Sequence, residues 1–328
     1  MGSEMCIRDR DTVTQDEKRV CLAANIGNAE DAVKAMESGA ECVGLFRTEF
    51  LFMNGVSMPT EEEQFEVYKR AAVICKNKVL TIRTLDIGGD KDIPYMGLTK
   101  ESNPFLGYRA IRFCLGRIDV FTTQLRAILR ASAYGNIRIM LPLITGVSEV
   151  RSVRTILQNV MRELDSKEIP YDKDILLGVM IETPAACMLA DILAKEADFF
   201  SIGTNDLTQY TIAVDRGNEN VAYLYSAFHP AVLRSVKRII ECAKRENIEV
   251  GMCGEAAGNP AMIPLLLAFG LDEFSVTASK VLETRKNIAS WTMKEAAAVT
   301  DTVMGMSTEK EVSAYLSDYI ATKMSNGK

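Results

Sequence analysis

Charged and polar side chains end several short apolar runs of this sequence. Arg47 closes "CVGLFR", Arg83 lies near the end of "VLTIRT", and Glu182 closes "LLGVMIE". Asn205 and Asp206 directly follow "FFSIGT". An apolar run typical of a buried strand, followed by a carboxylate, an amide or a guanidinium group, indicates a strand that holds a reactive group at its tip.

Glu182 and Asp206 are the candidate metal ligands. Two carboxylates on neighbouring strand tips suit a hard divalent cation such as Mg²⁺, with water and substrate oxygens at the remaining positions. The alternative is that Asp206 caps its helix and Glu182 pairs with an arginine. For either residue alone that alternative is favoured, whereas the two together favour a metal site.

Three arginines are candidate ligands for an anion. Arg47 and Arg83 end apolar runs, and an unpaired buried charge is costly, so each needs a partner. The planar guanidinium fork suits phosphate or carboxylate oxygens. The alternative is an internal ion pair, Arg47 with Glu49 or Arg83 with Asp86. Arg216, in the polar loop "AVDRGN", could close over an anion or be a solvated surface charge.

One thiol and the single histidine complete the candidates. Cys253 lies in "GMCGEAAG" after an apolar run, where a thiol of suitable pKa can exchange a proton with substrate. The other seven cysteines are interpreted as small buried hydrophobic residues. His229 precedes Pro230 and is predicted to cap or pack a helix start.

Eight apolar runs predict the strands that position these residues. They are continuous rather than alternating, which is typical of parallel strands buried on both faces. They span 20–25, 42–47, 79–84, 137–142, 176–182, 199–204, 248–254 and 273–278. With a helix after each strand, the simplest closure is a (β/α)8 TIM barrel, in which the strand ends converge on one mouth. An open, doubly wound sheet is the alternative.

Helix patterns with start signals lie between the runs. Polar caps or prolines mark most of these starts. The predicted starts are Asn28, Pro59-Thr60, Pro104, Ser148 or Gly146, Thr183-Pro184, Pro230 and Pro260, with a further helix over 118–134. The tail 283–325 is predicted to form two helices split near Gly305.

Composition sets the class of protein. The chain has 328 residues, 48% hydrophobic and 25% charged, as in a soluble globular protein. A net charge of −6 argues against a nucleic-acid binder. Eight cysteines without a CxxC pair predict a reducing cytoplasm. No apolar run is long enough to predict a membrane span. Residues 1–17 are expected to be a leader, foreign to the native protein or disordered.

Seven motifs in a fixed order carry a family resemblance. They are "GLFRTEFLFM", "IRTLDIGGDK", "NPFLGYRAIR", "MIETPAA", "SIGTNDLTQYTIAVDRGN", "HPAVLR" and "GMCGEAAG". From about residue 18 onward the chain resembles the C-terminal, phosphoenolpyruvate-binding half of enzyme I of the bacterial sugar phosphotransferase system. Pyruvate phosphate dikinase and phosphoenolpyruvate synthase share related motifs, but "TLDIGGDK" and the short length resemble enzyme I better.

The resemblance implies a phosphoenolpyruvate- and Mg²⁺-binding barrel with assigned site residues. Glu182 and Asp206 would ligate the metal, and Cys253 would protonate the enolate carbon as pyruvate forms. The other assigned residues would bind the substrate or lie beside it: Arg47, Arg83, Arg216, Asn205, Arg109 and Lys91.

The resemblance also implies partners. Enzyme I carries an N-terminal domain with the phosphoryl-accepting histidine and the surface for the histidine-containing phosphocarrier protein, and that region is missing from this sequence. His229 lies in the wrong motif to replace it. We therefore expect a domain that binds phosphoenolpyruvate and needs the missing domain for transfer, and a homodimer. The alternatives are a lyase that acts by enol chemistry alone and a phosphoenolpyruvate-sensing module.

Overall fold

Eight parallel strands close into a barrel in chain order. The computed structural model describes residues 11–53, 55–88, 93–97 and 99–326. Each strand pairs with the next, and β8 pairs with β1. The strands are β1 (Cys21–Ile26), β2 (Cys42–Arg47), β3 (Leu80–Arg83), β4 (Ile137–Leu141), β5 (Leu177–Ile181), β6 (Phe199–Ile202), β7 (Glu249–Met252) and β8 (Glu273–Thr277). The predicted (β/α)8 barrel is confirmed, and the open sheet is wrong.

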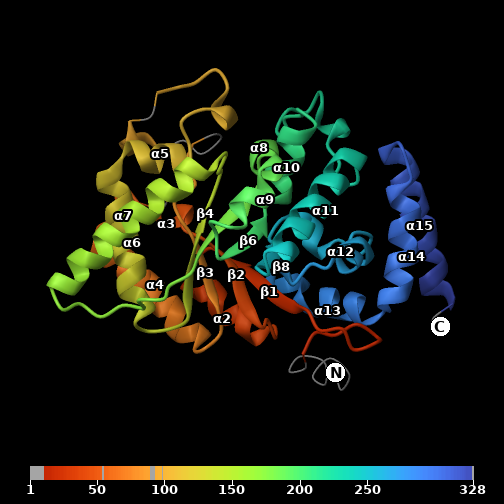
Figure 1. Ribbon diagram of the computed structural model, residues 1–328, viewed down its shortest axis with the longest axis horizontal. Helices are drawn as coiled ribbons and strands as arrows, with labels where there is room; N and C mark the ends of the chain where they lie inside the picture. Colours follow the sequence, from red (N-terminus) through yellow and green to blue (C-terminus); the bar gives the residue numbers. More distant parts are fainter. Residues whose placement is uncertain (1–10, 54, 89–92, 98, 327–328) are drawn as a thin grey trace.

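Helices follow the strands and surround the barrel (Figure 1). They are α2 (Ala29–Glu37), α3 (Glu49–Met53), α4 (Glu61–Cys75), α5 (Ile111–Gly116), α6 (Ile118–Ser132), α7 (Val147–Ser166), α8 (Pro184–Met188), α9 (Ala190–Leu193), α10 (Thr204–Thr211), α11 (Pro230–Arg245), α12 (Ile263–Phe269), α13 (Val281–Ala289), α14 (Met293–Met304) and α15 (Glu309–Asn326). In Figure 1, α14 and α15 lie side by side at one edge of the molecule.

Side-chain caps confirm four predicted helix starts. In each, a side-chain acceptor receives a hydrogen bond from a backbone N–H of the first turn, which would otherwise lack a partner. The capping residues are Asn28, Thr60, Thr183 and His229. His229 accepts through Nδ1 from the Ala231 amide at 3.2 Å, so the predicted capping role of the single histidine is confirmed.

Three predicted helices differ from the structure. Pro104 begins only a 3-10 turn, because Ala110 has a φ of 51° that a helix cannot accommodate, and α5 starts after it. Pro260 precedes α12 by three residues rather than opening it. The tail forms three helices instead of two, since Thr292 caps a new helix, α14, after α13. The predicted split near Gly305 is confirmed.

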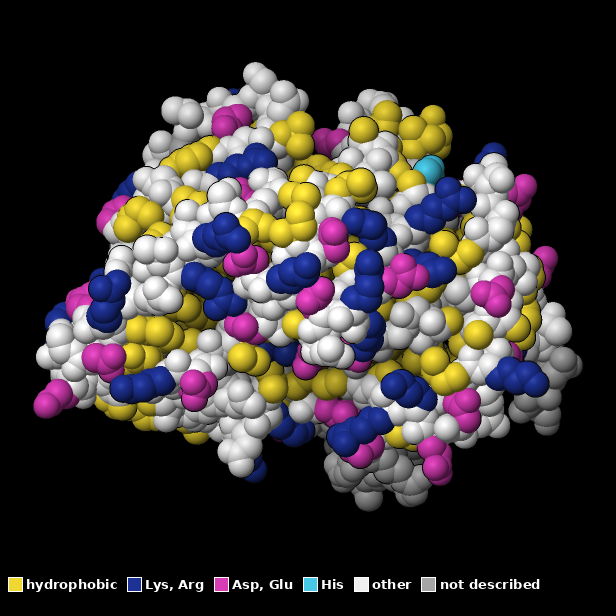
Figure 2. Space-filling model, in the orientation of Figure 1, with side chains coloured by type: hydrophobic (Ala, Val, Ile, Leu, Met, Phe, Trp, Pro, Cys, Tyr) yellow, Lys and Arg dark blue, Asp and Glu magenta, His cyan; other side chains and the backbone are white. Residues whose placement is uncertain are grey.

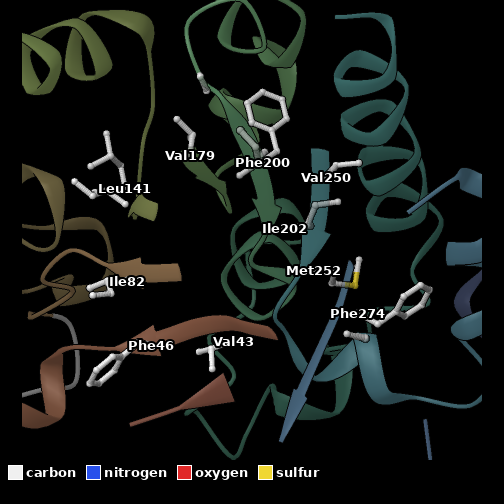
Figure 3. Packing of buried hydrophobic residues seen from close by; sticks show 14 of the residues in the cluster. Val43, Phe46, Ile82, Leu141, Val179, Phe200, Ile202, Val250, Met252 and Phe274 are labelled. Carbon is white, nitrogen blue, oxygen red and sulfur yellow. The ribbon is translucent and has the colours of Figure 1, made fainter. Parts of the chain in front are cut away.

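The apolar core has two layers, one on each side of the strands. The larger layer fills the space between strands and helices, and Figure 3 shows Phe46, Ile82, Phe200 and other members projecting from the strands. A smaller layer consists of side chains from β2, β4, β5, β6 and the end of β7: Leu45, Met140, Met180, Phe199 and Cys253. Because both faces of each strand are covered, the strands read as continuous apolar runs.

The folded unit begins before residue 18. Thr12 and Thr14 are buried, Val13 bridges Arg19, and the Thr12 hydroxyl accepts a hydrogen bond from Arg285 Nε at 3.0 Å. Residues 11–17 therefore pack on the barrel, which differs from the predicted leader. The remainder of that leader, residues 1–10, lies outside the described residues.

Positive and negative side chains are mixed on the visible face of the molecule (Figure 2). Among the described residues of this face, acidic side chains lie between the basic ones. In the part of the chain that the structure describes, none of the helices combines the length and the apolar composition that crossing a membrane would need.

Candidate active site

One cavity of about 730 Å³ lies at the carboxyl ends of the strands. Strands β2, β3, β5, β6 and β7 each deliver a polar side chain to it, as predicted for a barrel. The cavity brings together eight of the nine sequence-predicted site residues: Arg47, Arg83, Arg109, Glu182, Asn205, Asp206, Arg216 and Cys253. The ninth, Lys91, lies outside the described residues.

Arg83 is buried and paired inside the protein. Its Nη2 donates to Glu49 Oε1 at 2.7 Å, and its Nη1 lies 3.0 Å from Asp86 Oδ2. Burial acts to lower the pKa of Arg83, but the two carboxylates raise it above its ordinary value. The internal pair Arg83–Asp86 is thus present. The alternative pair Arg47–Glu49 is not observed, because Glu49 turns to Arg83 instead.

Arg109 joins two strand tips. Its Nη2 donates to Asp86 Oδ1 at 2.9 Å and to Asp206 Oδ2 at 3.1 Å, while Nη1 donates to the Tyr210 hydroxyl at 3.1 Å. Arg216 is more exposed, and its Nη2 lies 3.4 Å from Asp206 Oδ1. Asp206 therefore lies between two cations, one buried and one at the entrance of the cavity.

Arg47 differs from the other three arginines of the cavity. It is half-buried at the end of β2, and among the described residues no carboxylate lies within ion-pair distance of its guanidinium group. A cation in such a position favours an anionic ligand as its partner.

Glu182 is held by a strained turn after β4. Its Oε1 accepts a hydrogen bond from the Leu143 backbone N–H at 2.6 Å, and Leu143 has a φ of 54°, in the left-handed region. Burial, followed by repulsion from Asp206 and Asp86, raises the pKa of Glu182 to about 8. A Cβ at Gly203 would lie 2.7 Å from Glu182 Oε2, so only glycine leaves room for this carboxylate.

The carboxylates Glu182 and Asp206 fit a divalent cation. Asp206 Oδ1 is buried and accepts no hydrogen bond from any residue that the structure describes. Burial, followed by repulsion from Asp206 and Asp86, raises the pKa of Glu182, so a cation placed between these groups would favour its charged form. Because both groups offer hard oxygen ligands and face one cavity, they suit Mg²⁺ better than a thiophilic metal.

Asn205 and Cys253 occupy the tips of β6 and β7. The Asn205 side-chain oxygen accepts a hydrogen bond from the Glu255 backbone N–H at 3.4 Å. The backbone carbonyl of Asn205 accepts one from the Tyr225 hydroxyl at 3.1 Å. Cys253 is 4% exposed and packs with Leu45 and Met180. Burial raises the pKa of Cys253, so the group at the floor of the cavity is a protonated thiol.

Two contributors to the site are missed by sequence reasoning. The Leu143 N–H acts through the backbone in the apolar run "MLPL", which carries no polar signal. Tyr210 donates to the Phe105 carbonyl at 2.6 Å and accepts from Arg109. Its position four residues after Asp206 on α10 places both side chains on one helix face, a spacing that could have identified it.

Comparisons with known proteins identify the family of this chain. Residues 3–293 match the family model described as "PEP-utilising enzyme, PEP-binding domain". Proteins named phosphoenolpyruvate-protein phosphotransferase are 51% identical over 305 residues in Bacillus sp. (strain S), 50% over 301 in Priestia megaterium and 48% over 314 in Staphylococcus aureus (strain MSSA476). The alignments cover 93%, 92% and 96% of this chain and 53%, 52% and 55% of those proteins.

The chain thus spans about half the length of the curated relatives it matches. Among solved structures, a citrate lyase from Burkholderia xenovorans LB400 aligns at 16% identity over 61% of this chain and 68% of its own, with a TM-score of 0.40, too low to bear on function. The family match covers all eight strands of the barrel and the tips that carry the site. The chain therefore belongs to the family of PEP-utilising enzymes, of which it holds the PEP-binding domain.

Proposed function

We propose that this chain is the substrate-binding barrel of a phosphoenolpyruvate-protein phosphotransferase. It binds phosphoenolpyruvate, passes the phosphoryl group to a histidine on an N-terminal domain and releases pyruvate, as the first step of sugar uptake by the phosphotransferase system. The observation that carries this proposal is one cavity lined by four arginines, two metal-fitting carboxylates and a buried thiol.

The arginines fit a substrate with an anion at each end. Phosphoenolpyruvate carries a phosphate and a carboxylate, and the Arg47 guanidinium has no carboxylate partner among the described residues. Arg83 Nε and Arg109 Nε are buried N–H donors that find no acceptor among those residues either. Oxygens of the substrate would satisfy these donors, with Arg216 at the entrance and Asn205 beside the phosphate.

Charge stabilisation follows from the same groups. As the phosphoryl group leaves, negative charge spreads over its oxygens and over the enolate, where the fixed guanidinium groups offset it. Mg²⁺ held by Glu182 and Asp206 would add positive charge at the phosphoryl oxygens.

Cys253 supplies the proton that completes pyruvate. The enolate left behind must be protonated on carbon, from one face of the cavity. The Cys253 thiol lies at the floor among apolar side chains, and its raised pKa keeps the proton on sulfur until the enolate forms. A neutral thiol is therefore a suitable general acid here.

The partners in this proposal follow from the length of the relatives. The other half of those proteins would hold the phosphoryl-accepting histidine and the surface for the histidine-containing phosphocarrier protein. We also propose that the protein acts in the cytoplasm as a homodimer. These partners rest on the relatives, since the described cavity by itself contains only the substrate side of the reaction.

Calorimetry and a transfer assay test the proposal. Phosphoenolpyruvate is titrated into the chain with and without Mg²⁺, and the chain is then mixed with the separately produced N-terminal half of the Bacillus relative. We expect Mg²⁺-dependent binding, and phosphohistidine together with pyruvate only in the mixture. Rapid pyruvate release without the added half would indicate a lyase. Binding without transfer to any added half would indicate a sensing module.

A further inference from the structure

Two thiols touch at the amino end of the barrel, opposite to the candidate active site. Cys21 is the first residue of β1 and Cys42 the first residue of β2. Their Sγ atoms lie 3.0 Å apart. That distance is shorter than the ~3.5–4.0 Å optimum for non-bonded carbon atoms, although sulfur is the larger atom. The barrel thus presses the two sulfurs together.

A carboxylate and a guanidinium group complete this cluster. Cys42 Sγ donates to Glu273 Oε2 at 3.5 Å, and Arg138 Nη2 donates to the same oxygen at 2.8 Å. Glu273 is therefore positioned to accept the Cys42 proton, and Arg138 offsets the charge of the carboxylate. The contact with Cys21, burial and Glu273 raise the pKa of Cys42, so its sulfur attacks only as Glu273 takes the proton.

Access to solvent distinguishes Cys21 from the other cysteines. It is partly exposed, whereas the remaining cysteines that the structure describes are buried. An oxidant in solution therefore reaches Cys21 before Cys42, and before Cys253 in the cavity. Exposure of one thiol beside a buried second thiol is the arrangement of an attacking and a resolving cysteine.

The geometry is less suited to a metal ion, although the three ligand atoms of Cys21, Cys42 and Glu273 lie within 4.8 Å of one another. Two Zn–S bonds of ~2.3 Å at a tetrahedral angle hold their sulfurs ~3.8 Å apart. The observed sulfurs are closer, and Arg138 occupies the nearest carboxylate oxygen. Both features favour a bond between the sulfurs over a shared cation.

We propose that Cys21 and Cys42 form an oxidation site that closes to an intrachain disulfide when it meets hydrogen peroxide. The Cys21 thiolate attacks one peroxide oxygen, the O–O bond breaks, and hydroxide leaves, which converts Cys21 to a sulfenic acid. Cys42 sulfur then attacks Cys21 sulfur, the S–S bond forms, and the S–O bond breaks. The protons of the two thiols leave in water, so two thiols and one peroxide give one disulfide and two waters.

Both the sulfurs and the strand ends move in this step. A disulfide bond is ~2.05 Å long, so the sulfurs approach by roughly 1 Å from their observed separation. The bond would join neighbouring paired strands, where Ala23 lies opposite Cys42, so Cys21 is two residues from the opposite position and the strand ends must shift until the two Cα atoms are within the ~7 Å that a disulfide spans. The site lies at the other end of β2 from Arg47 and the proposed phosphoenolpyruvate site.

Mass spectrometry of the full chain tests this site. The reduced chain is treated with equimolar hydrogen peroxide, and intact mass and non-reduced peptides are measured. We expect a loss of two hydrogen atoms and a linked pair of peptides carrying Cys21 and Cys42. Cys75→Ala, which removes a buried thiol on α4, is the matched control and should give the same linked pair.

Two variants separate the steps. In Cys42→Ala, Cys21 should remain as a sulfenic acid that dimedone traps, because its resolving partner is gone. In Cys21→Ala, Cys42 should stay a thiol under the same dose of peroxide. The proposal is overturned if Cys21 instead links to Cys6, if it passes directly to the sulfinic acid in the unsubstituted chain, or if it stays reduced. Stoichiometric zinc that is lost in both variants would also overturn it.

Discussion

Each end of the barrel buries arginine side chains among carboxylates. Only at the amino end does every guanidinium nitrogen have a hydrogen-bond partner among the described residues. At the amino end, Arg138 Nε donates to Thr81 at 2.6 Å, Nη1 to Glu249 at 2.7 Å and Nη2 to Glu273 at 2.8 Å. Its guanidinium carbon also lies 4.1 Å from the centre of the Phe199 ring. Every nitrogen of this arginine is used inside the protein.

The carboxyl end of the barrel holds more charged side chains, and some of their buried atoms have no hydrogen-bond partner among the described residues. Arg83 Nε, Arg109 Nε and Asp206 Oδ1 are buried without a hydrogen-bond partner among the described residues. Arg47 has no carboxylate partner there. Buried polar groups are costly when unsatisfied, so such a network is maintained where a ligand completes it. The contrast teaches that satisfied buried charge indicates structure, whereas unsatisfied buried charge indicates a binding site.

The largest effect should come from the amino end. Arg138→Met leaves Glu273 buried without its counter-ion, and we expect the free energy of unfolding to fall by about 3–5 kcal/mol, measured by urea denaturation. The control Arg117→Met removes an exposed pair with Asp119 and should leave the unfolding curve unchanged. Equal curves for both variants would break the contrast between the two ends.

A large effect on chemistry should come from the thiol of the carboxyl end. Cys253→Ala removes the general acid, so we expect hydrogen exchange at the pyruvate methyl group to slow by about 10²-fold or more. Phosphoenolpyruvate affinity should be retained, because the arginines remain. Nuclear magnetic resonance in deuterated water measures the exchange, with Cys75→Ala as the control. Unaltered exchange would remove Cys253 from the reaction.

Arg47 tests the carboxyl end of the barrel, where we expect a charge to serve binding rather than stability. Arg47→Met takes away a cation that has no carboxylate partner among the described residues, so stability should change little. Loss of its charged hydrogen bonds to substrate should weaken phosphoenolpyruvate binding by about 1.5–3 kcal/mol, roughly 10- to 100-fold, measured by calorimetry. A variant that binds normally but unfolds easily would assign Arg47 to structure.

The pH dependence of stability should distinguish Glu182. In the metal-free folded chain its pKa is about 8, above the ordinary value of 4.5, so the unfolded state releases this proton first. Stability is therefore greatest below about pH 4.5 for this group and is lost as the pH rises toward about 8. Relative to Glu182→Gln, the unsubstituted chain should lose at most about 5 kcal/mol across that window, since the two pKa values differ by about 3.5 and each pKa unit corresponds to about 1.36 kcal/mol.

Urea denaturation in EDTA across the same pH range measures this difference. Added Mg²⁺ should restore stability at the alkaline end in the unsubstituted chain and have a smaller effect on Glu182→Gln. Parallel pH profiles for the two chains would show that the carboxylate is already compensated by Arg83 and Arg109.

The smallest effect should come from Tyr210→Phe. The hydroxyl accepts from Arg109 and donates to the Phe105 carbonyl, so its loss should weaken phosphoenolpyruvate binding by about 0.5–1.5 kcal/mol. Tyr223→Phe, at a residue 81% exposed, is the calorimetric control and should bind normally. A normal Tyr210→Phe would mean that Arg109 is fixed by its carboxylates alone.

The convergence of the site could be predicted from the sequence, because parallel strands in a closed barrel share one carboxyl end. Arg83, Glu182 and Asp206 are far apart in the chain and face one cavity. The ion pairs could not be predicted. Glu49 is two residues from Arg47 but pairs with Arg83, since Arg47 and Arg83 are partners in the β2–β3 register and α3 turns Glu49 toward the latter.

Backbone strain accounts for most of what the sequence does not reveal. Ala110 and Leu143 adopt positive φ values that isolated alanine and leucine avoid. Only the packed barrel stabilises these conformations, so no local pattern indicates them. The leader has a similar explanation, because the burial of Thr12 depends on contacts with Glu41 and Arg285, which lie far from it in the chain.

The orientation of the Glu182 carboxylate depends on the left-handed backbone conformation of Leu143. Glu182 is oriented by an amide, and alanine scanning at position 143 keeps that amide intact. Its contribution becomes visible only through semisynthesis, by exchanging the amide for an ester or by installing a D-residue, for which a φ of 54° is relaxed geometry. A D-residue at position 143 would thus separate the conformational cost of the turn from the stabilisation that its hydrogen bond gives to Glu182.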